Sequence, residues 1–211
     1  MNLNAVDEQT QLLVDNGHKV FQIHRFAKDD ESHLVRLERW AELPQDAKVL
    51  DMGSGVGELA KVFTKLRPDL NFYLVNLSKL QLSYSEEFTC HCCSFLDVPE
   101  QNESFDAVLF CFSIGHEDVE IALKEAHRLL KNNGILFIYD MVRVFGNNDN
   151  MKVVEYVVNS KETMQKAATG FKLDFYLEPT DDGQYGKSVL GEAFDYVFNG
   201  TIPAIWRFVK C

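Results

Sequence analysis

The stretch VLDMGSGVGELA, residues 49–60, decides the fold, because an apolar strand ending in an acid runs through three alternating glycines into the start of a helix. Glycine permits the tight turn and the close backbone approach that a ligand-holding loop needs. The N-terminus of the helix that follows favours a bound carboxylate or phosphate. The pattern predicts a ligand-binding loop, with a tight turn that holds no ligand as the alternative.

The glycine spacing departs from two common nucleotide-binding loops. Dinucleotide folds use G-x-G-x-x-G, and here Glu58 stands at the last glycine's place. A phosphate-binding loop of the Walker type ends in Gly-Lys-Ser/Thr, which is absent. The stretch instead resembles motif I of class I S-adenosylmethionine-dependent methyltransferases, whose pattern is an acid, any residue and then G-x-G-x-G, as in Asp51-Met52-Gly53.

This resemblance implies a cofactor, S-adenosylmethionine, with its methionine part against the loop. Asp51 is then expected to order the loop and the cofactor's ammonium group. The residues expected to line the methionine part are Gly53, Ser54, Gly55 and Gly57.

The second strand ends in a string that is similar to a subset of this superfamily, the enzymes acting on sterols, tocopherols, isoprenyl diphosphates and cyclopropane-forming lipids. Asn76 stands where most members carry an acid for the ribose hydroxyls, and an amide makes no charge-assisted bonds there. The resemblance assigns Gln81 to the ribose and places Leu77 in the cofactor site. The alternative is that Ser78 caps a helix and Gln81 lies on the solvated surface.

Further matches follow along the chain, and the resemblance covers residues 47–140. The turn after the third strand resembles the adenine-binding turn, so Ser94 and the backbone N–H of Phe95 are expected at the adenine. Phe95 also suits simple core packing. Cys111, at the end of the fourth strand, is assigned to the cofactor site. The segment EAHRLLKNNG, residues 125–134, is similar to the family's E-x-x-R-x-L-K-P-G-G.

His116 is the candidate catalytic base, because it follows the fourth strand and its ordinary pKa lies near 6.5. Related enzymes often carry E-x-x-x-H at this point, but Phe112 takes the place of the Glu. That departure speaks against carboxylate chemistry. The alternative is that His116 only opens a helix.

Alternating strand-like and helix-like segments from residue 47 predict an α/β fold: a Rossmann-like, mainly parallel seven-stranded sheet with flanking helices, whose last strand the resemblance makes antiparallel. Residues 1–45 are predicted to be a helical segment covering the site, and residues 46–211 the methyltransferase domain. Helices are expected at 58–66, 79–87 and 118–130, and within 151–169. Residues 181–186 are expected to be a mobile loop.

Composition limits the classes of partner and the compartment that are expected for the chain. The formal net charge is −11, which disfavours nucleic acid and anionic membrane surfaces. No apolar run approaches the roughly 20 residues of a membrane span, and the N-terminus does not resemble a signal peptide. Five cysteines, three of them at positions 90, 92 and 93, form no disulfide framework and favour the cytoplasm. Because neighbours on a strand face opposite ways, no metal site is expected at residues 90–93.

The sequence therefore predicts a cytoplasmic methyltransferase that transfers the methyl group of S-adenosylmethionine to a small molecule. Two alternatives stay open: an enzyme that uses the same cofactor for another reaction, and a non-enzymatic module that binds the cofactor. The acceptor, the methylated atom and the oligomeric state are not specified by the sequence.

Overall fold

A computed structural model describes residues 3–19, 27, 29–147, 155–179 and 199–211. One seven-stranded sheet runs through it in the order β3-β2-β1-β4-β5-β7-β6. Its strands are β1 (Lys48–Met52), β2 (Asn71–Asn76), β3 (Thr89–Cys92), β4 (Phe105–Cys111), β5 (Leu130–Arg143), β6 (Phe171–Leu177) and β7 (Thr201–Lys210). β7 pairs antiparallel with both β5 and β6, and the other pairs are parallel, which confirms the predicted sheet.

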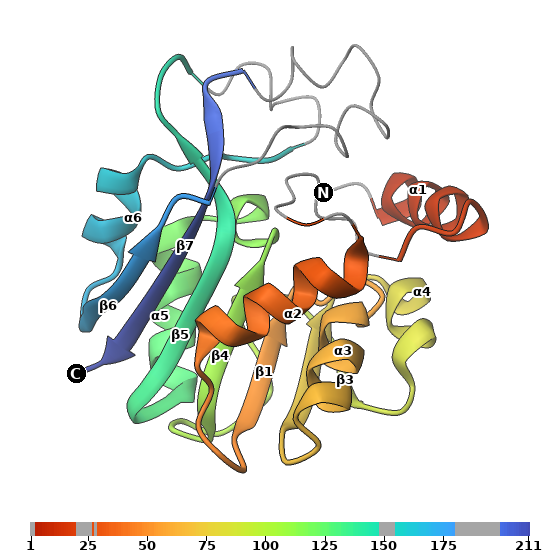
Figure 1. Cartoon of the computed structure of the whole chain (residues 1–211), viewed down its shortest axis with the longest axis horizontal. Coiled ribbons are helices and arrows are strands. Elements are labelled where there is room, and N and C mark those ends of the chain that lie inside the picture. Colours follow the sequence, from red (N-terminus) through yellow and green to blue (C-terminus); the bar gives the residue numbers. More distant parts are fainter. Residues whose placement is uncertain (1–2, 20–26, 28, 148–154, 180–198) are drawn as a thin grey trace.

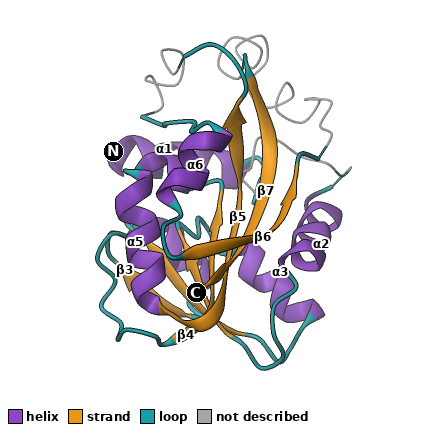
Figure 2. Cartoon of the chain, turned by 90° about the vertical axis from the view of Figure 1, so that its left-hand side faces the viewer, coloured by secondary structure: helices purple, strands orange, loops and turns teal. Residues whose placement is uncertain are grey.

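Helices cover both faces of this sheet. They are α1 (Leu3–Asp15), α2 (Asp30–Ala41), α3 (Glu58–Leu66), α4 (Lys79–Leu82), α5 (Val119–Leu129) and α6 (Lys161–Ala167), with short 3₁₀ turns η1 (Ser83–Ser85) and η2 (Ile114–His116). α2 and α3 lie on one face, and α5 and α6 on the other (Figures 1 and 2). Strands covered on both faces are apolar throughout, and four of the five residues of β1 are accordingly buried.

Two of the predicted helices are shorter in the structure. The helix expected at 79–87 ends at Leu82 and tightens into η1, where the Ser85 hydroxyl donates a 2.6 Å hydrogen bond to the carbonyl of Val56. In the described part of 151–169, α6 is helical and residues 155–159 form no helix. The predicted mobile loop, 181–186, lies outside the described residues.

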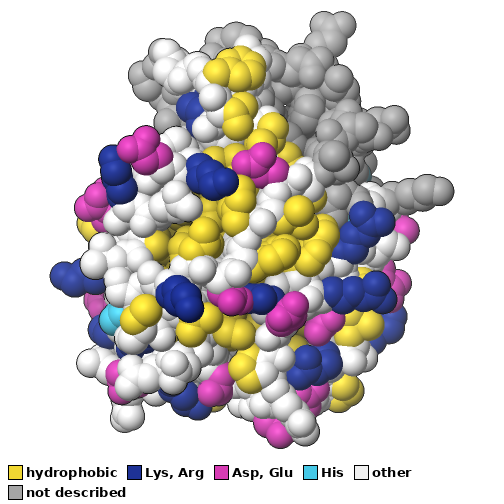
Figure 3. Space-filling view, turned by 60° about the vertical axis from the view of Figure 1, so that its left-hand side comes forward, with side chains coloured by type: hydrophobic (Ala, Val, Ile, Leu, Met, Phe, Trp, Pro, Cys, Tyr) yellow, Lys and Arg dark blue, Asp and Glu magenta, His cyan; other side chains and the backbone are white. Residues whose placement is uncertain are grey.

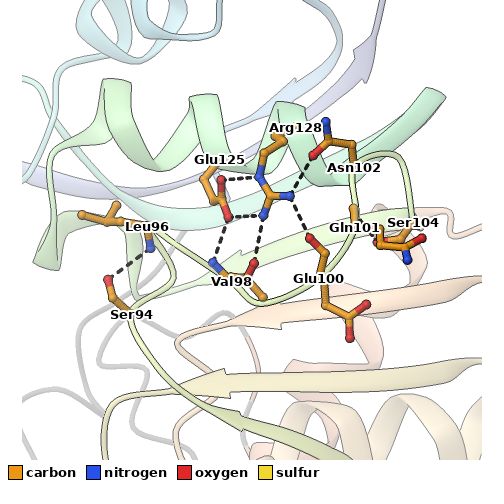
Figure 4. Close-up of polar contacts among 9 residues, drawn as sticks. All are labelled: Ser94, Leu96, Val98, Glu100, Gln101, Asn102, Ser104, Glu125 and Arg128. Atoms are coloured by element: carbon orange, nitrogen blue, oxygen red, sulfur yellow. Dashed lines mark hydrogen bonds and ion pairs between the residues drawn. The ribbon is translucent and has the colours of Figure 1, made fainter.

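An arginine on α5 fixes the loop between β3 and β4. The Arg128 guanidinium donates to the carbonyls of Val98 and Glu100 and to the side chain of Asn102, at 2.8–2.9 Å. The same group pairs with Glu125, whose carboxylate accepts from the Val98 N–H (Figure 4). This network explains the Glu and Arg of the segment 125–134 as a clamp on the loop that leads from Ser94 into β4.

Candidate functional site

The carboxyl ends of the central parallel strands bring most of the predicted cofactor residues together. Asp51 lies near the end of β1, Asn76 ends β2 and Cys111 ends β4. The glycine loop after β1 is the meeting point. A β-carbon built on Gly53 would lie 2.5 Å from the β-carbon of Ser113 and 3.8 Å from the ring of Phe95. Ligands of open α/β sheets bind at this edge.

At the end of β1 and in the glycine loop after it, two polar groups have no hydrogen-bond partner among the described residues. The Asp51 side chain is 2% exposed, and no described residue donates a hydrogen bond to its carboxylate. Burial therefore raises the pKa of Asp51 to about 7. The Ser54 hydroxyl is also buried and has no hydrogen-bond partner among the described residues. Buried polar groups are nearly always satisfied, so an unpartnered acceptor at the end of β1 and an unpartnered donor in the next loop fit a polar ligand.

Two of the loop glycines are required by the backbone conformation and by close packing within the protein. Gly53 and Gly57 have φ of 81° and 72°, values that favour glycine. A β-carbon on Gly57 would lie 2.1 Å from the hydroxyl oxygen of Ser85 and 2.8 Å from its β-carbon, so a side chain there would clash, as it would at Gly53. Because these glycines have no side chain, Ser113 and Ser85 can pack directly against the loop. Gly55, with φ of 57°, has the same left-handed backbone conformation.

The predicted ribose residues form a hydrogen-bonded pair. The Asn76 side-chain amide donates to Gln81 Oε1 at 2.8 Å, and Gln81 Nε2 donates to the hydroxyl of Thr10 on α1 at 2.7 Å. Gln81 is only 8% exposed, so it does not lie on the solvated surface. Leu77 is half-buried, and its carbonyl lies 3.5 Å from the Cys92 sulfur.

The predicted adenine turn is compact. The Ser94 hydroxyl accepts a 3.1 Å hydrogen bond from the N–H of Leu96, which closes the turn (Figure 4). Phe95 is buried and packs edge-on against Phe110, with ring centroids 5.4 Å apart. Core packing of Phe95 is thus observed, and its ring also lies beside the glycine loop.

His116 lies on η2, beside Tyr156, a residue that the sequence did not single out. Its ring meets Tyr156 edge-on, with centroids 4.7 Å apart. The residue as a whole is exposed to solvent, but packing against Tyr156 removes water from part of the imidazole. This desolvation lowers the pKa of His116. The Tyr156 hydroxyl in turn donates to the carboxylate of Asp140 on β5. An acid ending an apolar strand was visible in the sequence at Asp140, whereas nothing in the sequence marked Tyr156.

Cys111 lies between the two buried acids. Burial, with Asp51 and Asp140 nearby, raises the pKa of the Cys111 thiol well above its ordinary value. The thiol is therefore neutral at pH 7 and contributes packing rather than charge. Over the ranges that the structure describes, no three His, Cys, Asp or Glu side chains are grouped to hold a metal ion, and every helix is too short or too polar to cross a membrane.

Comparison with known proteins points the same way as this geometry. Residues 50–138 match a family described as a methyltransferase domain. That range contains the glycine loop, the predicted nucleoside residues and His116.

Two curated relatives match at 27% identity. An uncharacterized protein of Methanocaldococcus jannaschii matches over 160 residues, which are 71% of this chain and 62% of that protein. The 25S rRNA (adenine(645)-N(1))-methyltransferase of Schizosaccharomyces pombe matches over 99 residues, 47% of this chain and 29% of that enzyme. The chain thus spans less than two thirds of the length of either relative.

Solved structures share the whole fold. The [4+2]-cyclase SpnF superposes with a TM-score of 0.77 and 16% identity, covering 97% of this chain and 95% of its own. Geranyl diphosphate C-methyltransferase from Streptomyces coelicolor superposes with a TM-score of 0.73 and 14% identity, covering 92% of both chains, in complex with Mg²⁺, geranyl diphosphate and S-adenosyl-L-homocysteine. At these identities the likeness establishes the fold.

Proposed function

Because the chain carries a methyltransferase domain with the class I fold, we propose that it transfers the methyl group of S-adenosylmethionine to a small-molecule acceptor. The proposal depends on one observation above the others. The buried Asp51 carboxylate, near the end of β1, and the buried Ser54 hydroxyl, in the loop that follows, have no hydrogen-bond partner among the described residues.

These two groups suit the charged end of an amino acid. The Asp51 carboxylate accepts hydrogen bonds from an ammonium group, and the Ser54 hydroxyl donates to a carboxylate. We assign Asn76 and Gln81 to the ribose, with Leu77 beside them. The turn at Ser94 and Phe95 is assigned to the adenine. Cys111 and the glycines 53, 55 and 57 shape the wall of the site.

The cofactor supplies an electrophilic methyl carbon, so the chain's own task is to hold the acceptor in line and to exclude water. His116 lies on the loop after β4, the loop that begins beside the glycine turn through Ser113. Its lowered pKa keeps the imidazole neutral at pH 7. A neutral imidazole takes a proton from an acceptor that must lose one, which is the role we propose for His116.

Charge favours a small acceptor over nucleic acid. The net charge is −11, and on the face drawn in Figure 3 Lys and Arg side chains alternate with Asp and Glu and form no continuous basic field. Nucleic-acid binding draws its affinity from clustered cations. The match to the rRNA methyltransferase covers 99 residues, 29% of that enzyme, at 27% identity. Geranyl diphosphate, the ligand of one structural relative, is a small molecule.

Calorimetry tests the cofactor assignment. S-Adenosylhomocysteine is titrated into the wild-type chain, D51N and E120Q, with NAD⁺ as the comparison ligand. We expect S-adenosylhomocysteine to bind and NAD⁺ not to bind. D51N should weaken binding by about 10-fold or more, because one charge-assisted hydrogen bond is lost. E120Q, at an exposed position on α5, should bind like wild type. Binding of NAD⁺ alone would overturn the proposal.

A labelling experiment tests the reaction and the acceptor class. Methyl-labelled S-adenosylmethionine is incubated with the chain and either a metabolite extract or total RNA. Label in a small molecule supports the proposal, and H116Q should then lower transfer while leaving S-adenosylhomocysteine affinity unchanged. Label in RNA contradicts the small-molecule acceptor. Tight cofactor binding with no transfer to either mixture favours the binding module or another reaction.

A further inference from the structure

A continuous series of side-chain hydrogen bonds joins the first helix to the glycine loop. Gln81 Nε2 donates to Thr10 Oγ1 at 2.7 Å, and Gln81 Oε1 accepts from Asn76 Nδ2 at 2.8 Å. Asn76 Nδ2 also lies 3.4 Å from the carbonyl of Gly55. Thr10 is 2% exposed, so its hydroxyl is committed to this contact and is withdrawn from water.

Two further contacts hold α1 at this place. The Ser78 hydroxyl donates to Asp7 Oδ1 at 2.5 Å, and the Tyr84 hydroxyl lies 3.4 Å from Gln11 Oε1. Figure 1 shows α1 and α4 side by side, although about 70 residues separate them in the sequence. α1 is thus attached through the beginning of α4, where the predicted ribose residues lie.

The direction of each hydrogen bond in the series is fixed by a backbone donor. The N–H of Ser78 donates to Asn76 Oδ1 at 3.0 Å, so the Asn76 amide nitrogen must face Gln81. Gln81 therefore presents its oxygen to Asn76 and its nitrogen to Thr10. An amide nitrogen carries two hydrogens and a carbonyl oxygen two lone pairs. The second hydrogen of Gln81 Nε2 and the second lone pair of Asn76 Oδ1 remain for a ligand.

We propose that Thr10 is a positioning residue for the nucleoside: its hydroxyl holds the Gln81 amide so that Gln81 and Asn76 present one donor and one acceptor to the ribose hydroxyls. α1 thereby completes the ribose side of the site from outside the matched domain. The inference rests on the proposed function, because it takes S-adenosylmethionine as the ligand. A donor and an acceptor side by side match a vicinal diol, in which each hydroxyl both donates and accepts.

Calorimetry with two ligands tests this role. S-Adenosylhomocysteine and its 2′-deoxy counterpart are titrated into wild type, T10V, T10S and E8Q. We expect T10V to weaken S-adenosylhomocysteine binding by about 5- to 10-fold, the scale of one hydrogen bond. For the 2′-deoxy ligand, T10V should lower the affinity by less than about 2-fold, because this ligand lacks a hydroxyl that would hydrogen-bond to the Gln81 amide. T10S keeps the hydroxyl and should restore binding. E8Q, at an exposed position of α1, should bind like wild type.

Several outcomes overturn the inference. Equal losses for both ligands in T10V would mean that Thr10 only supports the fold, and no loss would mean that α1 is irrelevant to the nucleoside. If wild type binds neither ligand, the proposed function itself fails. Hydrogen exchange of the wild-type chain covers the case in which T10V does not fold. Saturating S-adenosylhomocysteine should slow exchange of the α1 amides, and unchanged exchange there refutes the inference.

Discussion

The Tyr156 hydroxyl lies 2.5 and 2.6 Å from the two carboxylate oxygens of Asp140, so one phenol serves both oxygens of a buried acid. The backbone N–H of Met141 also donates to this carboxylate at 2.7 Å, and the backbone N–H groups of Ser113 and Ile114 lie near enough to favour its charged form. Asp140 on β5 therefore lies against the loop after β4, and Tyr156 adds a third segment. His116 rests against the ring that completes this junction.

Replacing Tyr156 by phenylalanine should destabilise the chain by about 1–3 kcal/mol, the cost of leaving a buried acceptor without its partner. Burial already raises the pKa of Asp140 to about 7, and loss of the phenol should raise it further. Urea unfolding at pH 7.5 measures the change. Y84F removes a hydroxyl that makes only a 3.4 Å contact near the surface and should change stability little. Equal losses in both variants would contradict the role of the pair.

Asp51 should cost the ligand-free chain stability at neutral and alkaline pH. A carboxyl whose folded pKa is raised to about 7 binds a proton on folding, so its penalty is absent below pH 4 and grows as the pH rises to 7. A shift of three pKa units corresponds to about 4 kcal/mol. D51N should therefore stabilise the chain above pH 7, by up to that amount, and not at pH 4. Thermal unfolding across this range measures the gain, and a gain independent of pH would contradict it.

Gly53 and Gly17 make a matched pair, because both have φ of 81°. A β-carbon on Gly17 would meet nothing within 4 Å, whereas one on Gly53 would meet the β-carbon of Ser113 at 2.5 Å. G17A should lose about 1–2 kcal/mol from backbone strain alone. G53A should lose a further 1–3 kcal/mol or so from overpacking, and with it cofactor affinity. Denaturant unfolding compares the two, and equal losses would show that Ser113 moves aside.

Replacing Arg128 should lower the free energy of unfolding more than replacing an ordinary surface arginine. R128A leaves the Glu125 carboxylate, on a residue that is 9% exposed, without its cation and frees the loop at Val98. We expect a loss of about 2–4 kcal/mol, on the scale of breaking a buried pair. The control K166A removes a solvent-exposed ion pair with Glu162 and should cost well under 1 kcal/mol. Chemical unfolding separates these outcomes, and comparable values would contradict the clamp.

The sequence predicted the sheet because its strongest signals are local. A buried strand, a glycine turn and an amphipathic helix follow one another within 49–66. The antiparallel direction of the last strand was predicted from the resemblance to the methyltransferase superfamily. The positions of Asp51, Asn76 and Cys111 at the carboxyl ends of strands followed from the same alternation. Their assignment to a cofactor stays a prediction that the experiments above test.

Contacts across the chain could not be predicted in this way. Thr10 is one polar residue in a helix, and only folding places it on Gln81, 71 residues away. Tyr156 falls in a segment predicted to be helical, where its ring gave no sign of a partner. Ser113 and Ser85 explain two glycines that the sequence alone attributed to a ligand. Each of these pairs depends on tertiary packing, which local propensity does not encode.

The position of β7 bears on how the chain is synthesised. This strand comes last of the seven along the chain, yet it lies inside the sheet, between β5 and β6. Until residues 201–210 leave the ribosome, one long edge of β5 has no neighbour, and unpaired strand edges invite association between chains. A nascent chain stalled before that point should depend on chaperones, whereas release of the final strand closes the edge in a single step.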